Sequence, residues 1–494
     1  MIELNAANLT RLDKRIRIPC YDRSRLVRGI VHLGVGGFHR AHQALYTDEV
    51  LSHGDQAWGI VGAGILKQDR RMRDVLMSQD CLYTVVAKGS AGIDVSVVGS
   101  IVEYRYGGDS TACVIDALCA VDTRIISLTV TEEGYCYEPD SRQLDMKHPG
   151  IVHDLGLPNR PVTIIGCLAE ALDRVRRAGR TPPTVMSCDN VPHNGSVLRR
   201  LVLDFAAERD PDLAGFIEEQ VLFPNTMVDR ITPMTTDVQR EELKREYGLA
   251  DAWPVFCEDF RQWIIEDSFT RGRPDWSSVG VQFTSDVAPY ERMKIRMLNG
   301  AHMALSHLAY LAGYRDVDRA MADPDILTFV DGFIREASPT VGSVPGMDLD
   351  DYRRSLLGRF ANSAIHDQVF RLTMDSSRKI PNMLLPTLVD LLESGAPADH
   401  IAFANAAWIR FSTGTDETGA SIPVDDQQAG RLREAALSCA RDARPFLSLA
   451  GIFPGSIVAD RGYLKKVSGY LEEIRRSGAK QALAQFISQR RKTA

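Results

Sequence analysis

Three polar side chains able to act on an alcohol or a carbonyl group lie within nine residues: Lys294, Asn299 and His302. On an α-helix, which turns about 100° per residue, they fall at about 0°, 140° and 80° and share one broad face. A lysine near a cleft can act as a base when burial or nearby positive charge lowers its pKa. An asparagine amide can hold an alkoxide or carbonyl oxygen, and a histidine can orient a hydroxyl. The same spacing also fits a surface lysine, a buried asparagine cap and a core histidine, so spacing alone leaves both interpretations open.

A glycine-rich turn provides the second candidate, in the segment Gly34-Val-Gly-Gly-Phe-His-Arg-Ala-His42. Glycines at 34 and 36 allow a tight turn and a close approach of a pyrophosphate, which the following helix N-terminus attracts. The third glycine of a dinucleotide fingerprint is replaced by His39, and an ordinary strand-to-helix turn remains an alternative. The first acid after the next predicted strand is Asp69, which would accept ribose hydroxyls and repel a 2′-phosphate, favouring NAD over NADP. Its neighbours Lys67 and Arg70 weaken that preference.

A competing motif overlaps the first candidate, because Tyr290 lies four residues before Lys294. Short-chain dehydrogenases use a tyrosine and lysine at this spacing, within a single domain of roughly half this length. Here the pair lies about 250 residues past the glycine turn, so coincidence explains it better.

Three further polar segments follow predicted elements. Each could contact cofactor or substrate, and each has a plainer explanation as a helix cap, a salt bridge or a solvated helix end. They are Ser187-Cys-Asp-Asn190 with Val-Pro-His-Asn194 after it, Asp229-Arg230 within Asn225–Pro233, and the cations Arg371 and Lys379 around Asp375-Ser-Ser377.

The elements that must position these residues change character along the chain. Short β-branched runs at 29–34, 58–62, 124–130 and 183–187 alternate with helical stretches such as 39–51 and 162–177, which indicates parallel β-α-β units. Residues 82–100 predict a hairpin inserted in that sheet. After about residue 289 the pattern is helical, at 293–311, 324–336, 350–362, 384–394, 400–411 and 426–447.

We therefore predict an α/β protein with two domains. A Rossmann-like N-terminal domain with a mainly parallel sheet should span residues 1–284 and bind NAD. A mostly α-helical, substrate-binding and catalytic C-terminal domain should span 285–494. A site between two such domains is the common arrangement for small ligands.

Composition places further bounds on function. The chain has 494 residues and a formal net charge of -7, with 44% hydrophobic and 25% charged residues, as in ordinary globular proteins. This acidity argues against a surface that binds nucleic acid or anionic lipid. The nine cysteines are scattered and none forms a CxxC pair, which favours reduced thiols over disulfides or structural zinc. No signal peptide or run of 18 apolar residues is visible, so we expect a cytoplasmic protein with no membrane partner.

Taken together, these motifs resemble one family over essentially the whole chain, the polyol-specific long-chain dehydrogenases, and within it the mannitol 2-dehydrogenase branch. The residues that carry the resemblance are Gly34 to His42, Ser187-Cys-Asp-Asn190, Met227-Val-Asp229-Arg230-Ile-Thr-Pro233 and the signature Lys294-x4-Asn299-x2-His302.

The resemblance implies a zinc-independent hydride transfer between a secondary alcohol and NAD. It implies that Lys294 is the general base, that Asn190 and Asn299 hold the developing alkoxide, and that His302 positions the reacting oxygen. The remaining implied roles are substrate binding by Asp229, Arg371 and Lys379, a proton path through Glu291, and cofactor binding by Gly34, Val35, Gly36, Gly37, Phe38, His39, Arg40 and Asp69. Gln68 stands where the family often has a second acid, which makes a strict NAD preference less secure. The resemblance also implies a monomer.

The substrate expected from the resemblance is D-mannitol, converted to D-fructose, with D-arabinitol and D-sorbitol as alternatives. A fructuronate reductase, also called mannonate oxidoreductase, is the nearest rival within the family. A non-catalytic NAD-binding sensor is the rival of another class, and an intact set of Lys294, Asn299 and His302 argues against it.

Overall fold

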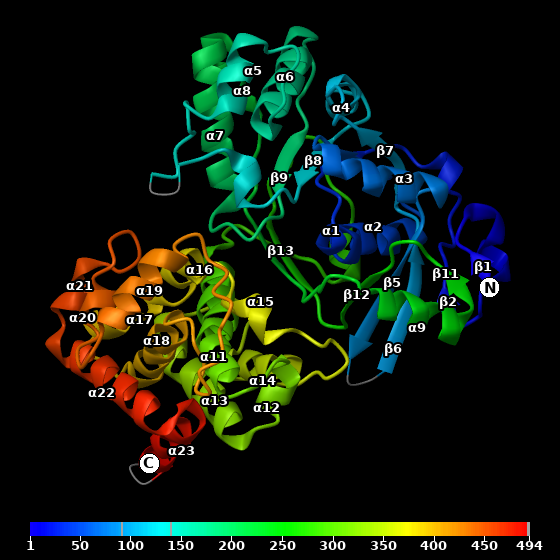
Figure 1. The fold of residues 1–494 in the computed structure, drawn as a ribbon. Helices are drawn as coiled ribbons and strands as arrows, with labels where there is room; N and C mark the ends of the chain where they lie inside the picture. Colours follow the sequence, from blue (N-terminus) through cyan, green and yellow to red (C-terminus); the bar gives the residue numbers. More distant parts are fainter. Residues whose placement is uncertain (90–91, 139–140, 492–494) are drawn as a thin grey trace. The chain divides into compact units, whose positions relative to one another are not determined.

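The computed structural model describes residues 1–89, 92–138 and 141–491. The chain divides into two compact units, Met1–Val287 and Ala288–Ala494. We call them unit 1 and unit 2 (Figure 1).

A five-stranded parallel sheet forms the centre of unit 1. Its strand order is β7-β4-β3-β8-β9, with β3 (Ile30–Leu33), β4 (Ile60–Gly64), β7 (Ile101–Tyr106), β8 (Ile125–Leu128) and β9 (Thr184–Ser187). Ile30 is in register with Ile60 on one side and with Ile125 on the other. The chain therefore starts in the middle of the sheet, moves outward to one edge and returns to build the other. The order reverses between β3 and β8, and the crevice at such a point is where ligands bind in open α/β sheets.

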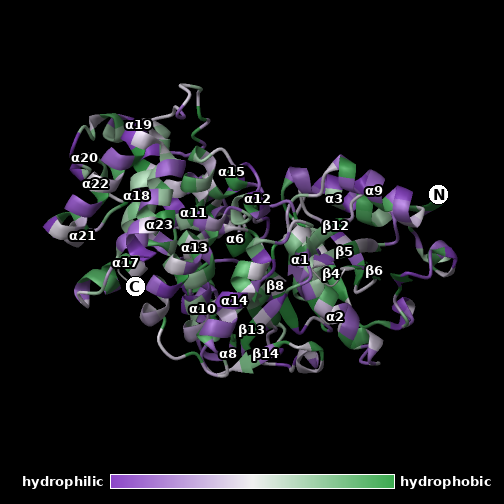
Figure 2. Ribbon diagram, turned by 90° about the horizontal axis from the view of Figure 1, so that it is seen from below, coloured by the Kyte–Doolittle hydropathy of each residue, from purple (hydrophilic) through white to green (hydrophobic). Residues whose placement is uncertain are grey.

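Strands β3, β4, β8 and β9 of this sheet are buried along their whole length, whereas the edge strand β7 is partly exposed. The side chains of β3 alternate between two apolar clusters. Val31 and Leu33 of β3 pack into one apolar cluster with helices α4, α6, α7 and α8, whereas Ile30 packs into another with α2. The helices show polar and apolar residues along their length, as expected for elements that cover a sheet (Figure 2). The α-helices of unit 1 are α1 (Gly37–Ala41), α2 (Gln43–Ser52), α3 (Arg70–Ser78), α4 (Ala112–Leu118), α5 (Pro149–Gly156), α6 (Ile164–Arg177), α7 (Asn194–Arg209), α8 (Pro211–Gln220) and α9 (Asp237–Tyr247).

The predicted hairpin exists, but its place in the fold differs from the prediction. Strands β5 (Tyr83–Gly89) and β6 (Gly92–Val98) are antiparallel, and the turn residues 90 and 91 lie outside the described residues. They belong to a separate sheet, because β12 (Val255–Glu258) pairs with β5 and β2 (Ile16–Arg17) pairs with β6. The prediction that the hairpin is inserted in the parallel sheet was therefore wrong. The remaining strands form two small sheets: β10 (Thr226–Asp229), β13 (Gln262–Glu266) and β14 (Gln282–Thr284), and β1 (Ile2–Glu3) with β11 (Leu249–Ala250).

The regular elements in the described part of unit 2 are all helices, apart from two isolated bridges. Its centre is α11 (Gly300–Leu311), in which every residue except Tyr310 is buried, as expected for a helix surrounded by others. The other elements are α10 (Ala288–Met293), a π-helix (Lys294–Asn299), α12 (Val317–Met321), α13 (Pro324–Ala337), a 3-10 helix (Ser338–Thr340), α14 (Leu349–Phe360), α15 (Val369–Thr373), α16 (Ser376–Met383), α17 (Leu385–Glu393), α18 (Asp399–Ser412), α19 (Ala429–Ser438), α20 (Arg444–Leu447), α21 (Gly455–Ala459), α22 (Arg461–Ser477) and α23 (Ala479–Arg491).

Two predicted helices of unit 2 are divided in the structure. The helix expected over 293–311 changes to π-helical hydrogen bonding between α10 and α11. The helix expected over 426–447 ends at Ser438, where Arg475 donates to the carbonyl oxygens of Cys439 and Ala440. This side chain satisfies carbonyl groups beyond the helix end, so the chain can turn before α20.

Candidate active site

The glycine-rich turn leaves the carboxyl end of β3 and enters α1. Gly34 has φ +87°, and a Cβ added there would lie 2.2 Å from the carbonyl oxygen of Thr129, so the fold itself requires glycine. Gly36 differs, because its φ is -113° and the nearest atom to an added Cβ is 3.9 Å away. Packing therefore does not require glycine at 36, and the open space beside it fits the close approach of a ligand such as a pyrophosphate.

His39 of α1 occupies the position of the missing third glycine, and its side chain contacts β3. Its ring stacks on the ring of His32 from β3, with centroids 3.4 Å apart and planes 9° apart. His32 is held in turn by the hydroxyls of Ser127 and Thr129, at 2.8 and 3.0 Å. Burial lowers the pKa of His39 well below its usual value, so the ring is neutral. A flat, uncharged ring thus replaces the close helix–strand contact that a glycine would otherwise permit.

Several predicted cofactor residues have side chains in the interior of unit 1. Val35, His39 and Arg40 are all buried. The Arg40 guanidinium donates to the carbonyl oxygens of Gly36 and Trp253. Cofactor contacts from these three residues would have to come from their backbone. The ring of Phe38 stacks on His42 at 4.8 Å and is only partly buried.

Asp69 lies just after β4, next in the sheet to β3. One carboxylate oxygen accepts a hydrogen bond from the backbone N–H of Leu66 at 2.8 Å. The side chain is half-buried, and burial raises its pKa. The structure therefore places an acid at the carboxyl end of the strand beside the glycine turn, where the NAD prediction needs one.

Asn190 and Asp229 follow two different sheets. Asn190 is exposed three residues after β9, and Asp229 is the buried last residue of β10. Asn194 connects the two positions, since its amide donates to the carbonyl oxygens of Asp189 and Thr226. Arg230 links β10 to the end of α1, because its guanidinium donates to the carbonyl oxygen of Ala41.

The π-helix begins at Lys294 and ends at Asn299. The backbone N–H of Gly300 donates to the carbonyl oxygen of Ile295, five residues earlier, which is the π pattern. Because a π turn is wider than an α turn, the angles predicted from an α-helix do not apply to Lys294 and Asn299. Such segments are frequent at functional sites.

The side chains around this segment are largely removed from solvent. Glu291, Lys294 and His302 are each 7% exposed. The His302 ring stacks on Phe360 of α14, with centroids 4.2 Å apart. Asn299 is half-buried. Unit 2 thus holds a lysine and a histidine in the interior within about two turns of the same helical segment.

Arg371 and Lys379 come together in unit 2. The ammonium of Lys379 donates to the carbonyl oxygen of Arg371 at 3.3 Å. The Arg371 guanidinium makes a two-pronged contact with Asp367, at 2.9 and 2.7 Å. Burial, and then the charge of Arg371, lowers the pKa of Lys379. His307 of α11 contacts the hydroxyl of Ser376 at 3.0 Å and so fixes the start of α16.

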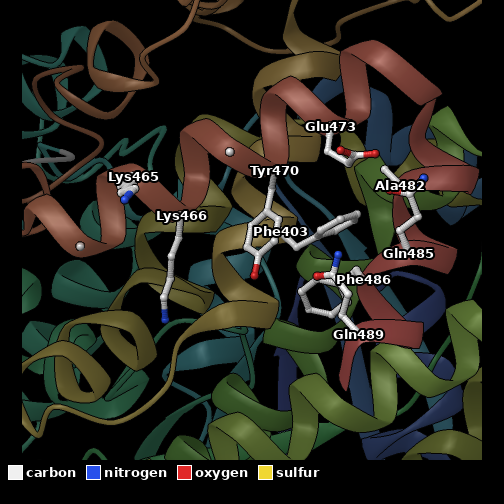
Figure 3. Close-up of a pocket in the computed structure, with 11 residues that line it drawn as sticks. Phe403, Lys465, Lys466, Tyr470, Glu473, Ala482, Gln485, Phe486 and Gln489 are labelled. Atoms are coloured by element: carbon white, nitrogen blue, oxygen red, sulfur yellow. The ribbon is translucent and has the colours of Figure 1, made fainter. Parts of the chain in front are cut away.

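An open groove of about 500 Å³ lies elsewhere in unit 2, between α18, α22 and α23. Figure 3 shows the rings of Phe403, Tyr470 and Phe486 gathered at its floor, with Lys465 and Lys466 to one side. None of the described residues that line this groove is a predicted site residue.

Metal-ligand clusters and membrane-spanning helices are both absent from the part of the chain that the structure describes. Within 1–89, 92–138 and 141–491, no three His, Cys, Asp or Glu side chains are grouped so as to hold a metal ion. Across the same ranges, no helix is long and apolar enough to cross a membrane.

Comparison with known proteins identifies the class of fold. The family model for the mannitol dehydrogenase Rossmann domain matches residues 28–278, and that for the mannitol dehydrogenase C-terminal domain matches residues 286–475. A Rossmann-type domain followed by a helical one is the predicted fold class, which is confirmed.

The relatives agree with this class over the whole chain. A mannitol 2-dehydrogenase of Pyricularia oryzae is 39% identical over 483 residues, covering 96% of each chain. One of Aspergillus fumigatus is 38% identical over 499 residues, covering 99% of each. The solved Pseudomonas fluorescens mannitol 2-dehydrogenase, a ternary complex with NAD and D-mannitol, is 41% identical with a TM-score of 0.90, covering 99% of this chain and 100% of its own. A substrate-free D-sorbitol dehydrogenase is 35% identical with a TM-score of 0.88, covering 98% and 100%.

The chain belongs to the mannitol dehydrogenase family, and the resemblance found in the sequence is confirmed.

Proposed function

We propose that this protein is an NAD-dependent polyol dehydrogenase that interconverts a sugar alcohol, D-mannitol first among candidates, and its ketose. The observation that carries the proposal is the full-length similarity to the Pseudomonas fluorescens enzyme solved with NAD and D-mannitol, at 41% identity. The buried lysine at 294 and the open space beside Gly36 support it from this chain's own structure.

In this proposal the glycine turn after β3 and the acid after β4 bind the cofactor. Gly34, Gly36 and Gly37 would bring backbone against the pyrophosphate, with Val35, Phe38, His39 and Arg40 contributing through their backbone or by packing. Asp69 would accept the ribose hydroxyls. When bound, NAD accepts a hydride from the carbon that carries the alcohol.

The chemistry assigned to side chains is a proton transfer with charge stabilisation. Lys294, as a neutral amine, takes the proton of the reacting hydroxyl, and Glu291 passes it on toward solvent. Asn190 and Asn299 donate amide N–H groups to the oxygen as it gains negative charge, and His302 orients that oxygen. Asp229, Arg371 and Lys379 bind the other hydroxyls of the substrate. No metal ion takes part in this scheme.

The test is NADH formation from NAD with D-mannitol at alkaline pH, followed by absorbance, with D-sorbitol, D-arabinitol and D-mannonate as comparisons. We expect turnover of a polyol, rising with pH as the lysine base becomes neutral. Lys294→Ala should lose turnover by about 10³-fold or more while keeping NADH binding. Lys88→Ala is a matched control, because Lys88 is a lysine of unit 1 that is also 7% exposed and is paired with Glu242.

Two other outcomes would change or refute the proposal. Turnover of D-mannonate alone would replace the polyol by a sugar acid. NADH binding without turnover of any substrate, unchanged in Lys294→Ala, would indicate a sensor and refute the proposal.

A further inference from the structure

The loops that follow the adjacent parallel strands β8 and β9 are joined by one carboxylate. Asp189, two residues after β9, accepts hydrogen bonds from the backbone N–H groups of Val130 at 3.1 Å and Thr131 at 2.9 Å. These two residues form the loop directly after β8. The Asp189 side chain is buried, at 8% exposed, so water competes little for these bonds.

Tyr135 completes the connection between the loops. Its hydroxyl donates to Asp189 at 2.9 Å and lies 2.5 Å from the hydroxyl of Ser187, the last residue of β9. Tyr135 is itself 1% exposed. Burial raises the pKa of Asp189, and its three hydrogen bonds act against that rise. Two backbone donors and one hydroxyl donor match a carboxylate that only accepts.

The loop after β8 would not keep its conformation without such bonds. Thr131 has φ 63° and ψ 169°, a region that is costly for a β-branched residue. Backbone in such regions persists where surrounding contacts hold it, and it is concentrated at functional sites. Here the contact is the Thr131 N–H bond to Asp189.

Asn190, the next residue along the chain, is the proposed alkoxide-binding amide. Asn190 follows Asp189 directly in the chain, so the place from which its side chain leaves the backbone depends on how Asp189 is fixed. Asp189 fixes that backbone against the loop after β8, and β8 is one of the two strands between which the strand order reverses, where ligands bind in open α/β sheets. Asn194 holds the Asp189 carbonyl oxygen from the other side, at 3.0 Å.

We infer that Asp189 and Tyr135 are a positioning pair for the alcohol oxidation: they touch neither substrate nor cofactor, and they hold the Asn190 amide and the loop after β8 in the geometry that turnover requires. This inference rests on the proposed function. It extends that function to Asp189, for which the sequence offered a helix cap as the plainer explanation, and to Tyr135, which the sequence motifs do not include.

The chain offers a matched control in Asp154. This carboxylate, also in unit 1, accepts bonds from the backbone N–H groups of Val162 at 2.7 Å and Thr163 at 2.9 Å, and from the Thr163 hydroxyl at 2.6 Å. It is 0% exposed. It makes the same kind of clamp on a loop with no proposed role in the reaction.

The experiment compares Asp189→Asn, Tyr135→Phe and Asp154→Asn with the wild-type chain. Asparagine places an NH2 donor against a backbone donor, so Asp189→Asn should lower kcat about 100-fold, with the Kd for NADH changed less than about fivefold. Tyr135→Phe removes one of the three bonds and should lower kcat about 5- to 10-fold. Asp154→Asn should lose resistance to urea yet keep kcat within about twofold.

Backbone amide hydrogen exchange tests the same inference without an activity assay. In Asp189→Asn, residues 129–131 and 188–191 should exchange faster together, and in Asp154→Asn only the segment around 162–163 should do so. Unchanged exchange in both segments of a folded Asp189→Asn, or an unchanged kcat in folded Asp189→Asn or Tyr135→Phe, would overturn the positioning role. If the wild-type chain itself oxidises no polyol, the proposed function fails, and the exchange data alone decide whether the clamp exists.

Discussion

The parallel sheet of unit 1 and the Lys294 segment of unit 2 position the proposed site residues in opposite ways. In unit 1 the proposed residues come from three loops far apart in sequence, those of Gly34, Asp69 and Asn190. These loops follow β3, β4 and β9, and because these strands are parallel, their carboxyl ends lie on the same side of the sheet. In unit 2, Lys294, Asn299 and His302 lie within one continuous helical segment, and the local hydrogen-bond pattern sets their relative angles. The first arrangement tolerates a changed residue, as His39 shows, whereas the second depends on the number of residues per turn.

The largest expected effect breaks the second arrangement. Insertion of one alanine after Ile295 adds a residue to a segment whose five-residue hydrogen bonds already span one residue more than those of an α-helix. Each helical residue added between Lys294 and α11 rotates Lys294 by about 100° relative to that helix. We expect kcat to fall by about 10³-fold or more, since misplaced groups lose most of their contribution. Steady-state kinetics with NAD and the preferred polyol measure it.

Ile295→Val is the control for this insertion, because it keeps the length of the segment. Its kcat should stay within about threefold of wild type. Full turnover in a folded insertion variant would show that the angle of Lys294 relative to α11 does not matter for the site.

The next effect separates two glycines of the same turn. Gly34→Ala forces a side chain into left-handed backbone and against the Thr129 carbonyl oxygen, so the free energy of unfolding should fall by about 2–4 kcal/mol. Gly36→Ala meets nothing closer than 3.9 Å and should change the free energy of unfolding by less than about 1 kcal/mol. It should still weaken NADH binding about tenfold or more, because the new methyl group fills the space proposed for the pyrophosphate.

Urea unfolding and NADH fluorescence titration on both variants give these values. Unchanged NADH affinity in Gly36→Ala would remove the pyrophosphate from this turn, while leaving the reason for glycine at 34 intact.

The smallest effect concerns the stacked histidines that replace the fingerprint glycine. Burial lowers the pKa of folded His39 well below that of the unfolded chain, so below pH 6.5 the unfolded state binds the extra proton. The contribution to stability is present above pH 6.5 and is lost as the pH falls toward the folded pKa. His39→Phe keeps a flat ring without this titration, so its acid-side loss of stability should be shallower by roughly 1 kcal/mol per pH unit between pH 6 and 5.

Comparing the slopes of the two proteins cancels the contribution of every carboxyl group they share. These slopes are obtained from the free energies of unfolding of wild type and His39→Phe at pH 7, 6 and 5. Parallel slopes would mean that the His39 ring is solvated or paired in the folded state.

The sequence was sufficient to predict the parallel sheet and the two-part fold, because β-branched runs such as Ile30–Leu33 and amphipathic helices such as Ile164–Arg177 have clear periods. It also indicated every proposed site residue, although their roles stay predictions. The π-helix was missed because apolar spacing does not distinguish a π turn from an α turn within six residues.

Other features depend on distant partners that no local pattern contains. The end of α19 is set by Arg475, and α22 and α23 have no predicted counterpart. Asp189 before Asn190 looks like a helix cap in sequence, and its true partners, Val130, Thr131 and Tyr135, lie more than 50 residues earlier.

The contacts around α1 also determine when the glycine turn can form during synthesis. Arg40 donates to the carbonyl oxygen of Trp253, and Arg230 donates to that of Ala41. A ribosome adding about 5–20 residues per second needs on the order of 10–40 s to proceed from residue 40 to residue 253. Throughout that interval α1 lacks two of the hydrogen bonds that fix it. The glycine turn therefore reaches its full set of contacts only after about half of the 494-residue chain has been made.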